Sequence, residues 1–314
     1  MSSSGTLSLT ALVPASLSGS VFADFNDDGQ IDFEEAGISG VSVHLTGTDD
    51  LGHAVSQTVQ SDGDGAYLFL NLRPGSYAIT KTTQPAGYTP GIDSVGTAGG
   101  SLSATVADQF FVTLTQGVNG LNYNYAEVPA ASGPVQTGQT APVGFWNNKN
   151  GQALIKAFNG GGTDGHGAHA LGDWLAATFV NMYGANSANN LAGKDNAYIA
   201  NLFQQDFLQK GQKLDAQVLA TALSVYATNA TLDSTGVAAQ YGFTVSGYGV
   251  GTATVNVGSN GDAFGVANNT SLTVMDLLLA TDAQAVKGVL YGGNTAKRSE
   301  ANAIYSALNQ AGNI

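Results

Sequence analysis

Hydrophobic and polar positions follow one period in the first part of the chain and another in the second. Up to about residue 128, apolar and polar residues alternate over short runs separated by Gly, Asp, Asn and Pro, a pattern typical of strands and turns. After residue 143, apolar residues recur every three or four positions over longer runs, which is typical of helices. The pattern predicts a multidomain protein, and 314 residues are enough for two hydrophobic cores.

The first domain, residues 17–128, is predicted to be an antiparallel β-sandwich. Short strands separated by turns over about a hundred residues are typical of an antiparallel sandwich. The predicted strands are residues 16–23, 41–45, 58–60, 66–70, 76–80, 109–114 and 121–125.

The second domain, residues 143–314, is predicted to be mainly helical with a small sheet. Residues 241–245 and 252–257 read as a β-hairpin. In the helix 215–228, Val218, Leu219, Ala222 and Val225 share one face. The predicted helices are residues 152–158, 171–183, 197–208, 215–228, 271–279 and 300–308.

Two segments fall outside these domains. Residues 1–16 form a leader that contains an alternating run, and Pro14 ends that run. Residues 129–142 are rich in Pro, Ala, Ser, Gly, Thr and Gln without periodicity, so they are predicted to be a linker.

The charge is concentrated in the β-domain. Residues 19–128 hold thirteen of the 23 acidic residues but only two of the ten Lys and Arg residues. A net charge of −13 argues against nucleic acid and anionic membranes as partners, and no apolar run is long enough for membrane insertion. Bound cations explain so acidic a domain better than solubility does. The absence of Cys does not decide between compartments.

A twelve-residue calcium-loop spacing runs from Asp24 to Glu35. Calcium takes six to eight oxygen ligands, and alternate residues of a tight loop point such groups inward. Gly29 stands at the position of the sharp turn. The predicted calcium ligands are Asp24, Asn26, Asp28, Gln30 (through its backbone carbonyl), Asp32 (directly or through water) and Glu35.

The flanks of this loop predict strands, not helices. A helix–loop–helix hand needs an amphipathic helix before Asp24, but residues 16–23 are short, Ser-rich and β-prone. Residues 41–45 alternate after the loop. We therefore expect the metal to stabilise a β-domain instead of opening a sensor groove.

The β-domain resembles the calcium-binding B repeat of serine-aspartate-repeat surface adhesins, the SdrD B-like domain. The resemblance implies an immunoglobulin-like sandwich on a secreted or surface-anchored bacterial protein, in which calcium rigidifies a stalk and the domain is not catalytic. Residues 143–314 resemble C-terminal regions of Asn/Gly-rich bacterial surface proteins with such repeats, for which no activity is implied. The motifs that carry the first resemblance are Gly19–Phe22, Gly37–Val41, Leu45–Gly47, Asp64–Phe69, Asn71–Tyr77 and Gln84–Tyr88.

Members of that family bind more than one calcium, so the resemblance implies further ligands. The candidates are Asp49, Asp50, Asp62 and Asp64, although shaping a hairpin turn is the commoner role for residues such as Asp62 and Asp64. A related sandwich family joins a first-strand Lys to Asn or Asp through an isopeptide bond. The first strand of this β-domain has no Lys, and its only Lys is Lys81, on a middle strand, so the sequence argues against that crosslink.

One short stretch could carry catalysis. Asp164, His166, His169 and Asp173 could hold zinc and activate water, as in a metal-dependent hydrolase. The two His residues lie in a Gly-rich loop without a nearby Glu, so a loop that caps the helix starting near Leu171 is favoured. We therefore expect no enzyme.

An aromatic pair opens the helical domain. Phe145 and Trp146 beside Asn147 and Asn148 could form a glycan-binding platform. An aromatic residue at the start of a domain is more often part of its core. We therefore expect the aromatic pair to be buried.

The predicted function is structural: a calcium-stabilised extracellular module of a bacterial surface, matrix or fibre. The alternative is an adhesin whose helical domain binds a glycan or a surface protein. Residues 11–16 echo residues 126–132, so residues 6–13 look like the last strand of another domain. One hypothesis is that this segment adds to a sheet edge of a neighbouring copy, which gives a head-to-tail polymer. The other, which is favoured, is that it is the first strand of its own domain.

Overall fold

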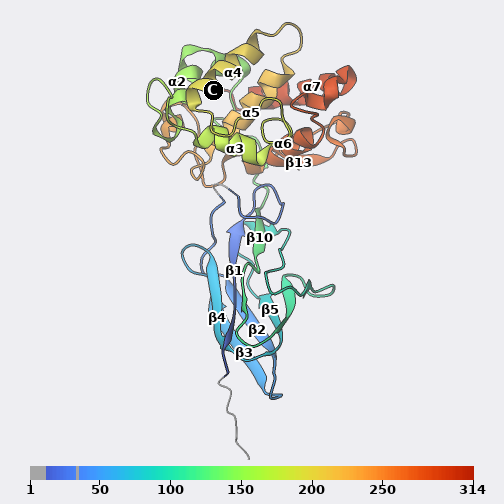
Figure 1. Cartoon of the computed structure of the whole chain (residues 1–314). Helices are drawn as coiled ribbons and strands as arrows, with labels where there is room; N and C mark the ends of the chain where they lie inside the picture. Colours follow the sequence, from blue (N-terminus) through green and yellow to red (C-terminus); the bar gives the residue numbers. More distant parts are fainter. Residues whose placement is uncertain (1–11, 33–34) are drawn as a thin grey trace, which may run out of the picture. The chain divides into compact units, whose positions relative to one another are not determined.

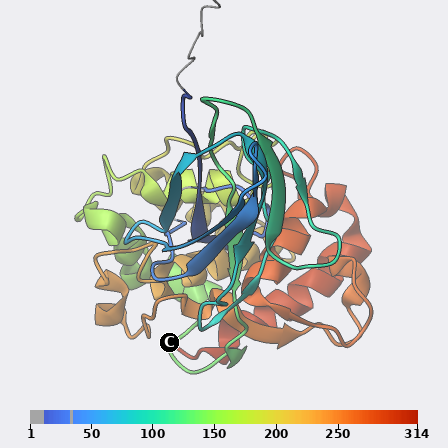
Figure 2. The ribbon, with the colours of Figure 1, turned by 90° about the horizontal axis from the view of Figure 1, so that it is seen from below.

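The computed structural model describes residues 12–32 and 35–314. It forms two compact units with a boundary between Pro129 and Ala130, called here the β-domain and the helical domain. In the described chain the helices belong to the second unit, the yellow-green to red part of the ribbon in Figures 1 and 2.

The β-domain consists of two sheets, as the alternating pattern predicts. One sheet has the order β4-β1-β10-β6 with β9 paired to β1, and the other has the order β3-β2-β5-β8-β7. The first and last long strands, β1 and β10, are parallel, and Val21 lies opposite Tyr125. The strands are β1 (Ala15–Ala23), β2 (Ser42–Asp49), β3 (Ala54–Gln60), β4 (Ala66–Leu72), β5 (Gly75–Lys81), β6 (Tyr88–Pro90), β7 (Ser101–Leu102), β8 (Gln109–Leu114), β9 (Asn119–Gly120) and β10 (Tyr125–Pro129).

The core lies between the two sheets because alternate residues of each strand point inward. Val43, Leu45, Ile79 and Phe110 are fully buried, while Phe111 beside Phe110 is exposed. The predicted strand at 121–125 is shifted: the last strand is Tyr125–Pro129. The sandwich itself is confirmed.

The helical domain contains the seven α-helices of the described chain, and each predicted helix is present with shifted ends. Residues 271–273, expected to be helical, instead form a strand before a helix that starts at Val274. The helices are α1 (Val143–Asn147), α2 (Lys149–Ala157), α3 (Ala170–Thr178), α4 (Asn196–Leu208), α5 (Leu214–Thr228), α6 (Val274–Ala283) and α7 (Thr295–Ala311). Short 3-10 helices are η1 (Phe158–Gly160), η2 (Val237–Tyr241), η3 (Gly249–Thr252), η4 (Gly261–Phe264) and η5 (Leu290–Gly293).

Helix α5 is the centre of the helical domain, with every residue except Asp215 buried. The face that carries Val218, Leu219, Ala222 and Val225 is buried, and the other faces are buried as well. A helix that is apolar or small on all sides is enclosed by other elements, and α5 packs against α7, α4, α6 and η3.

The predicted β-hairpin is also wrong. Residues 253–256 form a strand, β12 (Ala253–Asn256), but its neighbours are β11 (Gly133–Pro134) and β13 (Ser271–Thr273), not residues 241–245. Residues 237–241 form η2 instead. Local alternation identified one strand correctly but could not identify its distant partners.

The segment expected to be a linker belongs to the fold of the helical domain. β11 pairs with β12, and the Thr140 hydroxyl donates a 2.8 Å hydrogen bond to the Leu308 carbonyl. Thr140 and Ala141 are fully buried. The linker prediction for residues 129–142 fails because contacts with residues more than a hundred positions away hold a segment without any period of its own.

The proposed donor strand, residues 6–13, lies almost wholly outside the described residues, which begin at Leu12. None of the helices in the described part of the chain combines the length and the apolar content needed to cross a bilayer.

Candidate metal centre and other candidate sites

The first half of the predicted calcium loop is folded around the carboxylate of Asp24. This side chain is fully buried at the end of β1. Its Oδ2 accepts a 2.8 Å hydrogen bond from the Gly29 amide, and its Oδ1 accepts one of 3.3 Å from the Asp28 amide. Burial raises the pKa of Asp24, while these amides act in the opposite direction. A bound cation would favour the charged form of this carboxylate.

Gly29 makes the sharp turn that the spacing predicts. Its φ is +75°, a conformation that side chains resist. A Cβ on Gly29 would lie 2.6 Å from the carbonyl oxygen of Ile92. The Ile92 amide in turn donates to Oδ1 of Asp27, so the loop is tied to the segment after β6.

Asn26, Asp28 and Glu35 also make hydrogen bonds within the loop. Oδ1 of Asp28 accepts from the Gln30 amide at 2.9 Å, and Oδ1 of Asn26 accepts from the Asp28 amide at 3.3 Å. Oε1 of Glu35 accepts from the Phe25 amide at 2.9 Å, so the last ligand position reaches back to the first. Asp32 is half-buried.

The chemistry of this loop suits calcium because the donors are hard oxygens on a loop that already turns at Gly29. Within residues 12–32 and 35–314, no three His, Cys, Asp or Glu side chains lie together as a metal-binding group. The loop follows a strand and not a helix: the Ala23 amide donates to the Ala36 carbonyl at 2.9 Å, which closes the loop at its base.

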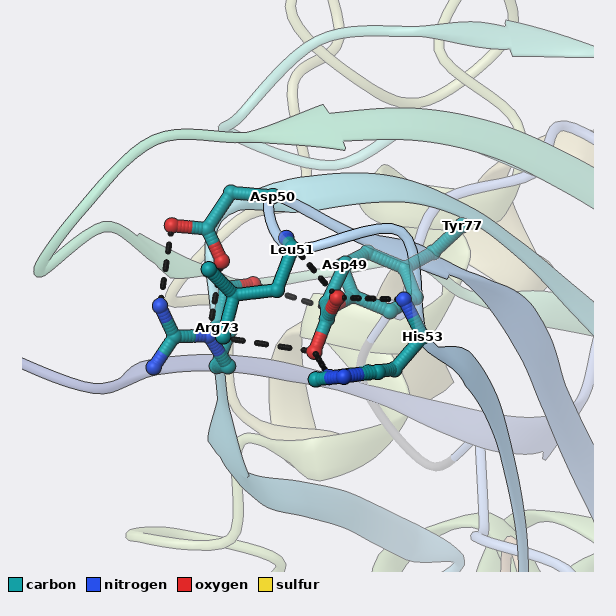
Figure 3. Close-up of polar contacts among 6 residues, drawn as sticks. All are labelled: Asp49, Asp50, Leu51, His53, Arg73 and Tyr77. Carbon is teal, nitrogen blue, oxygen red and sulfur yellow. Dashed lines mark hydrogen bonds and ion pairs between the residues drawn. The ribbon is translucent and has the colours of Figure 1, made fainter.

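Asp49 and Asp50, the lower-ranked calcium candidates, already have partners in the turn after β2 (Figure 3). Asp50 receives two hydrogen bonds from the Arg73 guanidinium, at 2.7 and 3.0 Å. Oδ1 of Asp49 accepts from the amides of Leu51 and His53, at 2.9 and 2.8 Å. Desolvation of Asp49 opposes the charged form, but these amides and the His53 ring lower its pKa.

Asp62 and Asp64 occupy a turn before β4. Oδ1 of Asp62 accepts from the amides of Asp64 and Ala66, at 3.0 and 2.9 Å, as an aspartate does when it shapes a turn. The turn explains Asp62 without a metal, and Asp64 is exposed.

The candidate zinc ligands Asp164, His166, His169 and Asp173 do not converge on a common point in the described structure. Nδ1 of His166 lies 2.8 Å from Oδ2 of Asp195, which caps α4 by accepting from the Tyr198 amide. Asp173 accepts from the Gly193 amide at 2.6 Å, and His169 directly precedes α3. The hydrogen bond that Asp195 accepts from His166 raises the pKa of His166. This arrangement gives the hydrolase alternative no metal-binding geometry.

The aromatic pair at the start of the helical domain is packed inside it. Trp146 is fully buried and lies with Phe145 against Phe243, with ring centroids 5.2–5.6 Å apart. A glycan platform needs an exposed ring face, so the burial reading is correct for Trp146.

A buried charged cluster in the β-domain was missed by sequence reasoning. Nζ of Lys81 contacts Oε1 of Glu127 and lies 3.2 Å from both Oδ2 of Asp108 and Oε1 of Gln84. The side chains of Lys81 and Glu127 are 1% and 0% exposed. Strand alternation could have revealed it, because Lys81 lies on the inward face of β5 together with Tyr77 and Ile79.

A comparison with family models decides the class of the β-domain. Residues 15–125 match the SdrD B-like domain. These residues form an SdrD B-like domain. The match covers about a third of the chain and leaves the helical domain outside it.

Two relatives of the SdrD B-like domain come from Staphylococcus aureus strain Newman. Serine-aspartate repeat-containing protein D is 37% identical over 116 residues, which cover 34% of this chain and 8% of that protein. Serine-aspartate repeat-containing protein C is 43% identical over 77 residues, covering 24% of this chain and 8% of that protein. The chain therefore corresponds to a small part of each relative.

Among solved structures, the full-length major pilin SpaD from Corynebacterium diphtheriae aligns with 41% of this chain and 35% of its own. The TM-score is 0.27 at 15% identity. The minor pilin GBS52 of Streptococcus agalactiae aligns with 40% of this chain and 49% of its own, with a TM-score of 0.25 at 15% identity.

Proposed function

We propose that the chain is a calcium-stabilised structural module that works outside the cell, as part of a bacterial surface, matrix or fibre. The SdrD B-like domain and its similarity to two serine-aspartate repeat-containing proteins support this proposal. The module acts by holding a fixed shape and needs no catalytic residues. The helical domain contributes a second rigid body to the same structure.

The observation that carries the proposal is the loop from Asp24 to Glu35. Its first carboxylate is buried against two amides, its glycine turns at positive φ, and its last carboxylate returns to the Phe25 amide. Asp24, Asn26, Asp28, Asp32 and Glu35 would supply side-chain oxygens and Gln30 its backbone carbonyl. Calcium would neutralise the crowded carboxylates and fix the loop that follows β1.

Removal of calcium should therefore destabilise the β-domain. A ligand present at 100 times its dissociation constant stabilises the folded state by about 2.7 kcal/mol. We expect EDTA to lower the melting temperature of the β-domain by several degrees and added calcium to restore it. Glu35→Gln should reproduce most of the loss, because it weakens the ligand that can bind with both oxygens.

Asp164→Asn is a suitable control, since this exposed carboxylate lies in the other domain. Calorimetry with and without EDTA on the full chain should give the same difference for this variant as for the natural protein. A melting curve that EDTA leaves unchanged would remove calcium from the proposal.

A finer proposal concerns assembly. We propose, as the alternative to the favoured strand of its own domain, that residues 6–13 add to a sheet edge of another copy, which would join copies head to tail. Deletion of residues 1–13 should abolish polymers seen by light scattering while the monomer stays folded. Polymers that persist after the deletion, or natural protein that never polymerises, would leave the segment as a strand of its own domain.

A further inference from the structure

The buried cluster around Lys81 joins the two sheets of the β-domain. Lys81 ends β5 in one sheet, and Glu127 lies in β10 of the other. Their amine and carboxylate are in contact, and both side chains are sealed from solvent. The backbone fixes both ends, since the Lys81 amide donates to the Asp108 carbonyl and the Glu127 carbonyl accepts from the Asp24 amide.

The cluster contains more carboxyl groups than it can neutralise. One amine faces Glu127 and Asp108, and Asp93 lies close enough for its charge to affect the amine. Burial lowers the pKa of Lys81, which favours the neutral and nucleophilic amine. Burial and the neighbouring Asp108 raise the pKa of Asp93 to about 7.

Enclosing an ion pair in this way costs free energy, because both charges lose their hydration. A neutral amide between the same two groups would remove both charges and keep the link between the sheets. Both products of the condensation, the amide and the released water, are uncharged.

We propose that Nζ of Lys81 and Cδ of Glu127 form an intramolecular amide bond. The neutral amine attacks Cδ, and Oδ2 of Asp108, 3.2 Å from Nζ, accepts the proton that the nitrogen loses. Glu127 holds the proton that the ammonium gave up when it became neutral, and Asp108 passes the second proton to Oε1, which leaves as water. From Lys-NH3⁺ and Glu-COO⁻ the products are one amide and one water, without any oxidant.

Gln84 positions the carboxyl group for this step. Its Nε2 donates to Oε2 of Glu127, the oxygen that remains as the amide carbonyl, and its Oε1 accepts from the amine. The same side chain therefore orients both reacting groups. The crosslink of the related sandwich family joins a first-strand Lys to Asn or Asp, whereas here a middle strand supplies the Lys and the last strand supplies Glu.

Mass spectrometry of the purified full chain tests the bond. The intact mass should be lower than the sequence mass by one water, about 18 Da. After digestion, the peptides that contain Lys81 and Glu127 should be recovered as one linked species, with no tryptic cleavage after Lys81. Recovery of both peptides separately and unmodified would overturn the proposal, and this measurement needs no variant.

Two variants separate the bond from other losses of water, such as ring closure at an Asp-Gly step. Lys81→Arg should show no loss of 18 Da relative to its own sequence mass, because arginine lacks the amine. Asp108→Asn should lower the linked fraction several-fold, because it removes the proton acceptor. A full loss of water in Lys81→Arg would overturn the bond, and full linkage in Asp108→Asn would overturn the role of Asp108.

Discussion

Buried and half-buried carboxyl groups of this chain differ in what compensates for their lost hydration. Asp282 accepts from the Asn181 and Met182 amides, at 3.0 and 2.7 Å. Asp215 pairs with Arg298, at 2.5 Å. Asp206 on α4 has no cation of its own among the contacts of the described residues and receives only an amide hydrogen bond from Gln209, at 3.2 Å. Burial, together with the charge of Asp215, raises its pKa to about 7.

The raised pKa of Asp206 makes stability depend on pH. The carboxyl binds its proton more tightly in the folded state than in the unfolded state, where its pKa is near 3.8. Its contribution to stability is therefore full below about pH 4 and is lost as the pH rises through about 7. Asn cannot titrate, so Asp206→Asn should gain in melting temperature relative to the natural protein between pH 5 and pH 8.

Thermal melts at pH 5, 6, 7 and 8 measure this gain. We expect it to reach a few degrees at pH 8, since 1 kcal/mol shifts the melting temperature of such a domain by about 2–4 °C. The exposed variant Asp164→Asn should follow the natural protein. Parallel curves for Asp206→Asn would show that the group titrates normally.

At the scale of single residues, the sequence predicts where the backbone needs an unusual conformation better than it predicts which side chains pair. The calcium spacing alone identified Gly29 as a turn position, and its φ of +75° agrees. The partner of Asp50 could not be predicted in the same way, because Arg73 lies 23 positions away and only the pairing of β2 with β5 brings them together.

At the scale of the element, α5 is held by a polar network as well as by apolar packing. Nδ2 of Asn309 on α7 donates to the backbone carbonyl and to Oε1 of Gln217, and Oδ1 of Asn309 accepts from the Thr221 hydroxyl at 2.9 Å. Asn309 and Thr221 are fully buried. The network fixes the register between the two helices, because each group has a specific partner.

Asn309→Ala should destabilise the helical domain by about 1–3 kcal/mol or more, because the buried groups of Gln217 and Thr221 lose their partners. Chemical denaturation of the full chain measures the loss as a lower midpoint of the second domain. Gln310→Ala is the matched control, since its neighbouring hydrogen bond to Ser306 is exposed. Equal stability of the two variants would contradict the role of the network.

The helical period of the apolar residues predicted a helix at 215–228, but it did not show that this helix is buried on all sides. Val218, Leu219, Ala222 and Val225 share one face, while Ser224 and Thr228 are polar residues of the same helix. Both hydroxyls instead donate to carbonyls one turn earlier, at 2.9 and 2.7 Å. Small hydroxyl residues satisfied inside their own helix cannot be distinguished from surface residues by period alone.

At the scale of the whole molecule, the boundary between the units lies at Pro129 and Ala130. We expect residues 130–314 expressed alone to fold and melt cooperatively. Residues 143–314, the domain that the sequence suggested, should be markedly less stable, because they lack β11 and the Thr140 contacts. Circular dichroism melts of the two fragments measure the difference, and equal stability would return residues 130–142 to the status of a linker.

The class of both domains could be predicted from the period of the apolar positions, whereas the boundary could not. Residues 133–134 are too short to show alternation, yet they pair with residues 253–254. The domain boundary therefore depends on contacts between segments that are distant in the sequence, and local patterns do not reveal such contacts.

The parallel pairing of β1 with β10 has a mechanical consequence. A force that pulls the two ends of the β-domain apart draws β1 toward its amino end and β10 toward its carboxyl end. In parallel strands these directions are opposite along a common axis, so the bonds linking residues 21–23 to residues 125–127 are loaded together in shear. Antiparallel strands pulled in this way would open one bond at a time. The domain is therefore built to carry tension along the chain.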